Sequence, residues 1–201
     1  MRWLPFVVVG ACLISNSWMP AVAQYLSDTQ RAYQELLVDE KSDLASDRLR
    51  VTALKEPSAR EFLVERLPDL IRKPAGRAWI NAVRLTGDLK IVEAVPVLAS
   101  LLKDPYSKGG LTGATSFGTI FILGDDPAGR ALADIGEPAL KAVETLLQDP
   151  DIHVRWRAAL VLGNMNSQYA DQALERNLAN ETNEAVRGYT LAVLKEHKIA
   201  K

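Results

Sequence analysis

Residues capable of chemistry gather in the stretch DPDIHVRWRAALVLGNM, which begins at position 149. His153 stands just before Arg155, Trp156 and Arg157, and this combination could supply a general base and cationic groups beside an aromatic ring. The chain has two histidines, and the other, His197, lies in a charged C-terminal tail. Because His153 falls in the first turn of a predicted helix, we expect a solvated helix-start residue there and no catalytic base.

Motifs for the common catalytic chemistries are missing from the sequence. HExxH, GxSxG and a cysteine–histidine pair are all absent, so zinc, serine-hydrolase and thiol mechanisms lack their parts. The acidic pairs Asp125/Asp126 and Asp149/Asp151 precede predicted helices, where carboxylates act as caps. A hydrolase that uses carboxylates alone stays open, because such a pair forms in space. We therefore predict a protein without enzymatic activity, metal or cofactor.

A glycine-rich insertion at 106–126 interrupts the third of the helix-pair repeats that the sequence predicts. It lacks the Gly-Lys-Ser/Thr ending of a phosphate-binding loop and the GxGxxG spacing. A connection of this length inside a compact array is usually functional or mobile. Two interpretations stay open: a partner-binding or gating element, and an insertion packed against the array.

The N-terminus has the features of a signal peptide. Arg2 precedes an uncharged, mostly apolar run, and the small residues of Ala21-Val22-Ala23 suit a signal peptidase. We expect cleavage after Ala23 and therefore a periplasmic or secreted protein without a membrane span in the mature chain. The alternatives are an uncleaved anchor and a lipoprotein acylated at Cys12, the single cysteine of the chain.

The composition is that of an ordinary folded protein, with 48% hydrophobic and 24% charged residues. A formal net charge of −1, with basic residues scattered along the chain, gives no electrostatic footprint for nucleic acid. Nucleic acid is therefore not an expected partner.

Helical patterns broken by Asp, Pro and Gly follow one another from position 24, with no strand-like alternation. The string PAGRA at 74–78 returns at 127–131, and LLKDP at 101–105 returns as LLQDP at 146–150. Val154-Arg155 returns 32 residues later as Val186-Arg187. Repetition at about thirty residues is typical of a solenoid.

Prolines and glycines mark the expected ends of these helices. Pro57 and Pro127 stand at predicted helix starts. Gly87, Gly136 and Gly163 are expected to close successive second helices, where a residue with positive φ is easily accommodated.

One repeat unit can be followed along the chain through a set of short strings. They are Pro138-Ala139-Leu140, Leu146-Leu147-Gln148-Asp149-Pro150-Asp151, Val154-Arg155, Ala158-Ala159 and Leu162-Gly163. With these residues the stretch 137–166 resembles a HEAT repeat, and 90–136 and 168–196 are similar to it with departures. The resemblance is closest to short repeats of the phycobilisome-lyase type, and it implies an all-α, HEAT-like α-solenoid of about five antiparallel helix pairs over 24–201.

The same resemblance implies structural roles at the inter-helix turns. Arg155 and Arg187 would be ladder arginines, which donate hydrogen bonds to an aspartate in an adjacent inter-helix turn. Asp104 and Asp149 would be the acceptors. Asp151 would cap its helix at the N-terminus. Arg155 therefore belongs to the seam between repeats.

Trp156 fits the repeat pattern less well, because a polar residue usually stands at its position. Trp156, Arg157, Leu160 and Tyr189 are predicted to form an exposed aromatic strip on the concave face, where aromatic and arginine side chains favour binding. Burial of Trp156 against a neighbouring repeat or the insertion is the alternative.

The predicted function is a non-enzymatic protein-interaction module or scaffold outside the cytoplasm, which binds another protein through this concave face. One alternative is a ligand-binding protein or enzyme with a pocket under the 106–126 insertion. The other is an envelope component that assembles with itself.

Overall fold

The computed structural model describes residues 19–72, 76–104 and 126–199. Most of the predicted signal peptide, including Cys12, lies outside these ranges. The predicted insertion lies outside them as well, except for its last residue, Asp126. Cleavage after Ala23 would fall inside the first described helix, which begins at Met19.

The described residues form α-helices and two short 3₁₀ helices, and they contain no strand. The elements are, in chain order, α1 (Met19–Leu36), α2 (Ser42–Lys55), α3 (Pro57–Leu70), α4 (Gly76–Asp88), η1 (Val92–Ala94), α5 (Val95–Leu101), α6 (Pro127–Ile135), η4 (Glu137–Ala139), α7 (Leu140–Leu146), α8 (Ile152–Asn164), α9 (Gln168–Leu178) and α10 (Glu184–Ile199).

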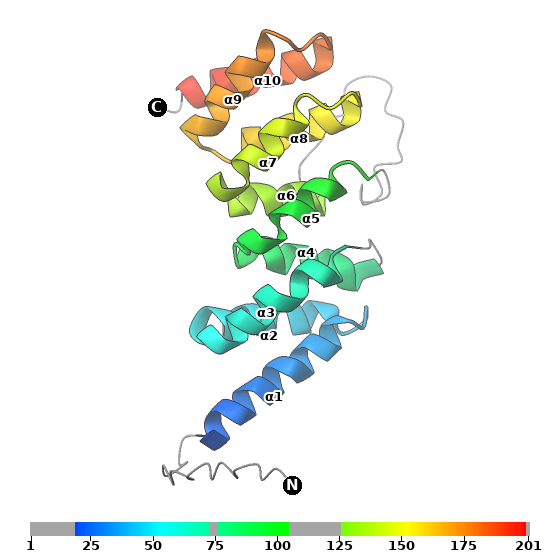
Figure 1. The fold of residues 1–201 in the computed structure, drawn as a ribbon, viewed down its shortest axis with the longest axis vertical. Helices are drawn as coiled ribbons and strands as arrows, with labels where there is room; N and C mark the ends of the chain where they lie inside the picture. Colours follow the sequence, from blue (N-terminus) through cyan, green and yellow to red (C-terminus); the bar gives the residue numbers. More distant parts are fainter. Residues whose placement is uncertain (1–18, 73–75, 105–125, 200–201) are drawn as a thin grey trace, which may run out of the picture.

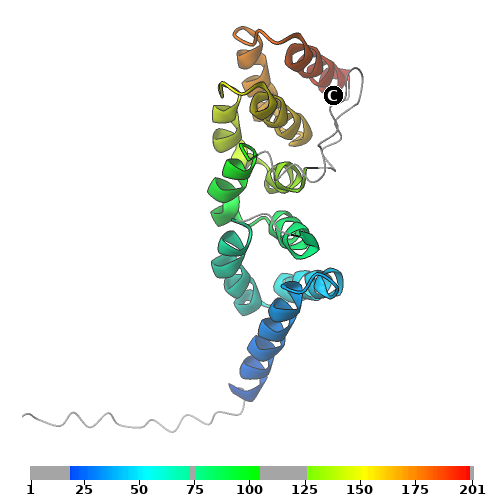
Figure 2. The ribbon, with the colours of Figure 1, turned by 90° about the vertical axis from the view of Figure 1, so that its right-hand side faces the viewer.

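Successive helices pair and stack along one axis (Figure 1). Turned by 90°, the array shows two layers, with α3, α5, α7 and α9 in one and α2, α4, α6, α8 and α10 in the other (Figure 2). Helix α1 packs against α2 and completes the first pair. The prediction of an all-α solenoid of five helix pairs is confirmed for the described residues.

Side-chain caps fix where α6 and α8, the second helices of their pairs, begin. Asp126 accepts a hydrogen bond from the Gly129 amide at 3.0 Å, immediately before Pro127 at the start of α6. Asp151 accepts one from the His153 amide at 2.8 Å at the start of α8. These bonds satisfy amides that have no partner within the helix.

The three glycines expected at helix ends have two different roles. Gly136 follows α6 with φ at 79°, as predicted. Gly87 and Gly163 instead lie within α4 and α8, so the prediction of end positions with positive φ is wrong for them. A Cβ at Gly87 would lie 2.8 Å from the Cα of Ala131, so this glycine allows α4 and α6 to pack closely.

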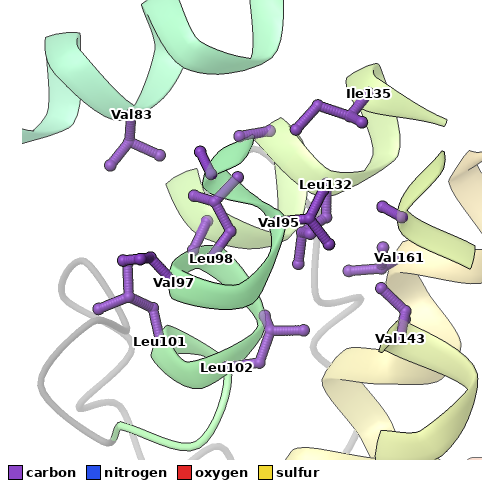
Figure 3. Close-up of a cluster of buried hydrophobic side chains, with 14 of the residues drawn as sticks. Val83, Val95, Val97, Leu98, Leu101, Leu102, Leu132, Ile135, Val143 and Val161 are labelled. Carbon is purple, nitrogen blue, oxygen red and sulfur yellow. The ribbon is translucent and has the colours of Figure 1, made fainter. Parts of the chain in front are cut away.

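The core is continuous along the array. In its middle, valine, leucine and isoleucine side chains from α4 to α8 point toward one another (Figure 3). Each repeat thus buries its apolar face against its neighbours, as solenoids require. The labelled residues are Val83, Val95, Val97, Leu98, Leu101, Leu102, Leu132, Ile135, Val143 and Val161.

Candidate functional site

Trp156 and Tyr189 form an aromatic pair between α8 and α10. Their ring centroids are 5.6 Å apart, with an interplanar angle of 42°. Both side chains are half-buried, and both pack against the edge of the core. The pair therefore keeps part of its surface accessible and is held in a fixed position by the helices beneath it.

Gly163 is what allows Tyr189 to approach α8. A Cβ at Gly163 would lie 2.7 Å from the Tyr189 Oη. This distance is too short for a side chain to be accommodated unless Tyr189 or α8 shifts. Burial, with a smaller effect from Glu196, raises the pKa of Tyr189 to about 12. The phenol is consequently neutral over the physiological range and can donate a hydrogen bond.

Arg157 and Leu160 are not on an exposed face, so the predicted four-residue strip is wrong in this respect. Each residue is only 5% exposed. Helix α8 packs against α6, α7, α9 and α10, which leaves it little free surface. Only Trp156 and Tyr189 of the predicted strip keep a half-buried position.

Arg157 is instead the centre of a buried polar cluster. Its Nε and Nη2 donate to the two carboxylate oxygens of Asp126 at 2.6 and 2.8 Å. Its Nη1 donates to the main-chain oxygens of Leu101 and Leu102, at the end of α5, at 3.1 and 2.6 Å. The main-chain oxygen of Asp104, a predicted ladder acceptor, lies 3.4 Å from the same nitrogen. One guanidinium thus joins α5, α6 and α8.

Arg155 joins two inter-helix turns, but its acid partner differs from the predicted one. Its Nε and Nη2 donate to the carboxylate of Glu181 at 2.9 and 3.1 Å. Its Nη1 donates to the main-chain oxygens of Asp149 and Pro150 at 3.0 and 3.1 Å. The arginine therefore connects the α7–α8 turn with the α9–α10 turn.

The Asp149 carboxylate pairs with the repeat that precedes it. Lys103 Nζ lies 2.8 Å from this carboxylate, which also accepts a hydrogen bond from the Asp151 amide at 3.0 Å. Glu181 stands at the matching place in the next turn and accepts from the Asn183 amide at 2.8 Å. Aligning Val154-Arg155 with Val186-Arg187 places Glu181 opposite Asp149. This alignment could have identified Glu181 as an acidic residue of the inter-helix turn from the sequence alone.

Arg187 bonds within its own turn. Its Nη1 donates to the main-chain oxygens of Leu178 and Glu181, the latter at 3.0 Å. Helix α10 is the last described helix, and within the described residues this side chain bonds to no later turn. Its predicted ladder role is therefore limited to one repeat in this structure.

These contacts shift the pKa values of the carboxyl groups. Burial acts to raise the pKa of Glu181, but hydrogen bonds from Arg155 and from the Asn183 amide together outweigh burial and hold it below its usual range. Hydrogen bonds from Lys103 and from the Asp151 amide lower the pKa of Asp149. Both groups are therefore carboxylates at neutral pH, as a ladder of ion pairs requires.

His153 is exposed, whereas His197 pairs with Asp171 of α9 through its Nδ1 at 2.6 Å. Among the residues that the structure describes, no group of three His, Cys, Asp or Glu side chains could hold a metal ion. Within the same ranges, no helix is long and apolar enough to cross a membrane.

Comparison with known proteins gives one positive result, and it falls on the part of the array that holds the aromatic pair and the ladder. No curated protein matches the chain. Residues 127–195 match the family model of HEAT repeats.

Proposed function

We propose that this protein is a non-enzymatic interaction scaffold that binds another protein around Trp156 and Tyr189. Both residues lie in the second-helix layer, which consists of α2, α4, α6, α8 and α10 (Figure 2). HEAT repeats commonly serve as protein-interaction scaffolds, and residues 127–195 match them. The observation that carries the proposal is the half-buried aromatic pair. Aromatic side chains with part of their surface accessible are the usual anchors of binding hot spots.

The surroundings of the pair favour a preorganised surface. Arg155 and Arg157 hold α8 by hydrogen bonds to neighbouring turns and helices, and Gly163 leaves room for Tyr189 to pack closely against α8. A partner would therefore meet side chains that lose little conformational freedom on binding. The short-repeat variety named above, the phycobilisome-lyase type, remains part of this proposal.

Affinity capture of partners from the native host tests this function. Trp156→Ala should weaken capture about thirtyfold or more, because truncating a hot-spot aromatic costs about 2 kcal/mol or more. Trp156→Phe keeps an aromatic ring and should retain part of the binding, which separates recognition from folding. Capture that both variants leave at the wild-type level would refute the proposal.

We further propose that the protein acts outside the cytoplasm after cleavage at Ala23. The support is the charged, apolar and small-residue order of residues 2–23. The intact mass of the protein purified from its host tests this directly. A chain that begins at Gln24 is expected, whereas an acylated Cys12 or a retained Met1 would contradict the proposed cleavage.

A further inference from the structure

A groove crosses the C-terminal end of the array between α9 and α10. Its volume is about 420 Å³, and Leu178, Leu191 and Leu194 form the apolar part of its lining. The corresponding surface of the preceding pair, α7–α8, is covered by α9 and α10 (Figure 1). Leu191, by contrast, is 53% exposed. The groove is therefore the surface against which a further element would pack.

One stripe of α10 runs along this end of the array. Glu184, Gly188, Leu191 and Lys195 follow one another at spacings of four, three and four residues, which places them on one face of a helix. All four are exposed, whereas Val186 on the other side of α10 is buried. The stripe thus has an acidic end, a small residue and a leucine in the middle, and a basic end.

Both charges of the stripe are available to a partner. Within the described ranges, neither Glu184 nor Lys195 is in an ion pair, whereas the nearby Lys198 pairs with Glu175 at 3.1 Å. A Cβ at Gly188 would meet no atom within 4 Å, so the surface is open at that position. An incoming side chain could lie against the Gly188 backbone.

This stripe is complementary to a second copy of itself. Glu184 and Lys195 are equally far from a point between Tyr189 and Thr190, and so are Gly188 and Leu191. Two α10 helices placed antiparallel about a two-fold axis at that point would pair each Glu184 with the Lys195 of the other copy. Each Leu191 would lie over the Gly188 of the other copy, as a self-complementary interface requires.

We infer that the C-terminal end of the array is a homodimer interface in which two copies pair through α10. This inference is independent of the function proposed for the Trp156–Tyr189 pair, because the stripe lies on the opposite side of α10 from the contact with α8. The expected partner is a second copy of this chain, held by two symmetric ion pairs around an apolar centre.

Head-to-tail continuation of the array is disfavoured by the same surface. Inside the array, Gly163 of α8 makes room for Tyr189 of the next second helix. The repeat alignment places Lys195 at the corresponding position of α10. A long charged side chain there would obstruct a closely packed parallel helix, whereas the two-fold arrangement sets it against a carboxylate.

Sedimentation velocity over a range of protein concentrations tests the inference through charge reversal. The wild-type protein is expected to approach twice the monomer mass as concentration rises. Glu184→Lys and Lys195→Glu should each weaken association at least about tenfold, since each variant sets like charges against one another across the two-fold axis. An equimolar mixture of the two variants should restore the dimer, because both pairs then join opposite charges.

The control is Glu196→Lys, which makes the same charge change as Glu184→Lys at an exposed position of α10 outside the stripe, on the side of Tyr189. It should dimerise like the wild-type protein. The circular dichroism of each variant verifies its fold, and the mixture reports on pairing even if one variant is less stable. A wild-type protein that stays monomeric, single variants that dimerise normally, or a mixture that fails to associate would each overturn the inference.

Discussion

Replacement of Arg157 by methionine probes the most heavily bonded side chain of the array. Arg157 and Asp126 form a bidentate pair, with side-chain exposures of 6% and 4%. The substitution leaves the Asp126 carboxylate buried without its cation and removes the donor from two main-chain oxygens of α5. Breaking a buried pair from one side costs about 3–5 kcal/mol, a large share of a typical stability of about 5–15 kcal/mol.

Urea denaturation followed by circular dichroism measures this loss. A fall of about 6–20 °C in the melting temperature should accompany it, at about 2–4 °C per kcal/mol for a chain of this size. Asp126→Asn in the Arg157→Met background should recover part of the loss, because it removes the uncompensated charge. Arg130→Met is the matched control, since Arg130 pairs with Asp134 on the surface of α6 and should cost below about 1 kcal/mol. Equal losses for the two arginines would refute the assignment of Arg157 to a buried cluster.

Two further predictions follow from single contacts. Gly163→Ala should destabilise the protein by about 1–3 kcal/mol, because the added methyl group meets the Tyr189 Oη. Gly188→Ala, in open space on a helix, should stabilise the protein by about 0.5–1 kcal/mol at concentrations where it is monomeric. Thermal melting that ranks the two variants the other way would contradict the close packing at Gly163. The pKa of Glu181 is lower in the folded protein than its ordinary value of 4.5, so its contribution to stability is present above that pH and is lost as the pH falls through the folded-state pKa. Glu181→Gln should therefore reduce the acid dependence of the unfolding free energy below about pH 4.5 and leave its slope near neutral pH unchanged, and a titration of stability with the same acid dependence as the wild type would show that the Arg155–Glu181 pair does not form.

Repetition made the fold predictable from sequence. The recurrence of PAGRA and of the LLxDP turn locates second helices and turns, and it led to an array of five helix pairs. Capping residues such as Asp151 are equally predictable, because their bonds reach only two residues along the chain. Local rules are sufficient for features of this range.

The site was harder to predict because it depends on contacts between repeats. Arg157 looks like a surface residue on a single helix, and only the approach of α5 and α6 to α8 buries it. The same limitation affected Gly163, which resembles a helix terminator until Tyr189 of α10 lies beside it. Helical periodicity shows which face a residue occupies, but it does not show how many neighbours cover that face.

Site-specific photo-crosslinking in the native host tests the central claim most directly. A crosslinking amino acid at His153, an exposed position one turn before Trp156 on α8, samples the proposed surface without disturbing the aromatic pair. Lys141, exposed on α7 in the other layer, serves as the control position. A discrete adduct with another protein from His153, absent from Lys141 and reduced by Trp156→Ala, is the predicted result. Identical adducts from both positions, or no adduct from His153 in folded and abundant protein, would contradict binding through the second-helix layer.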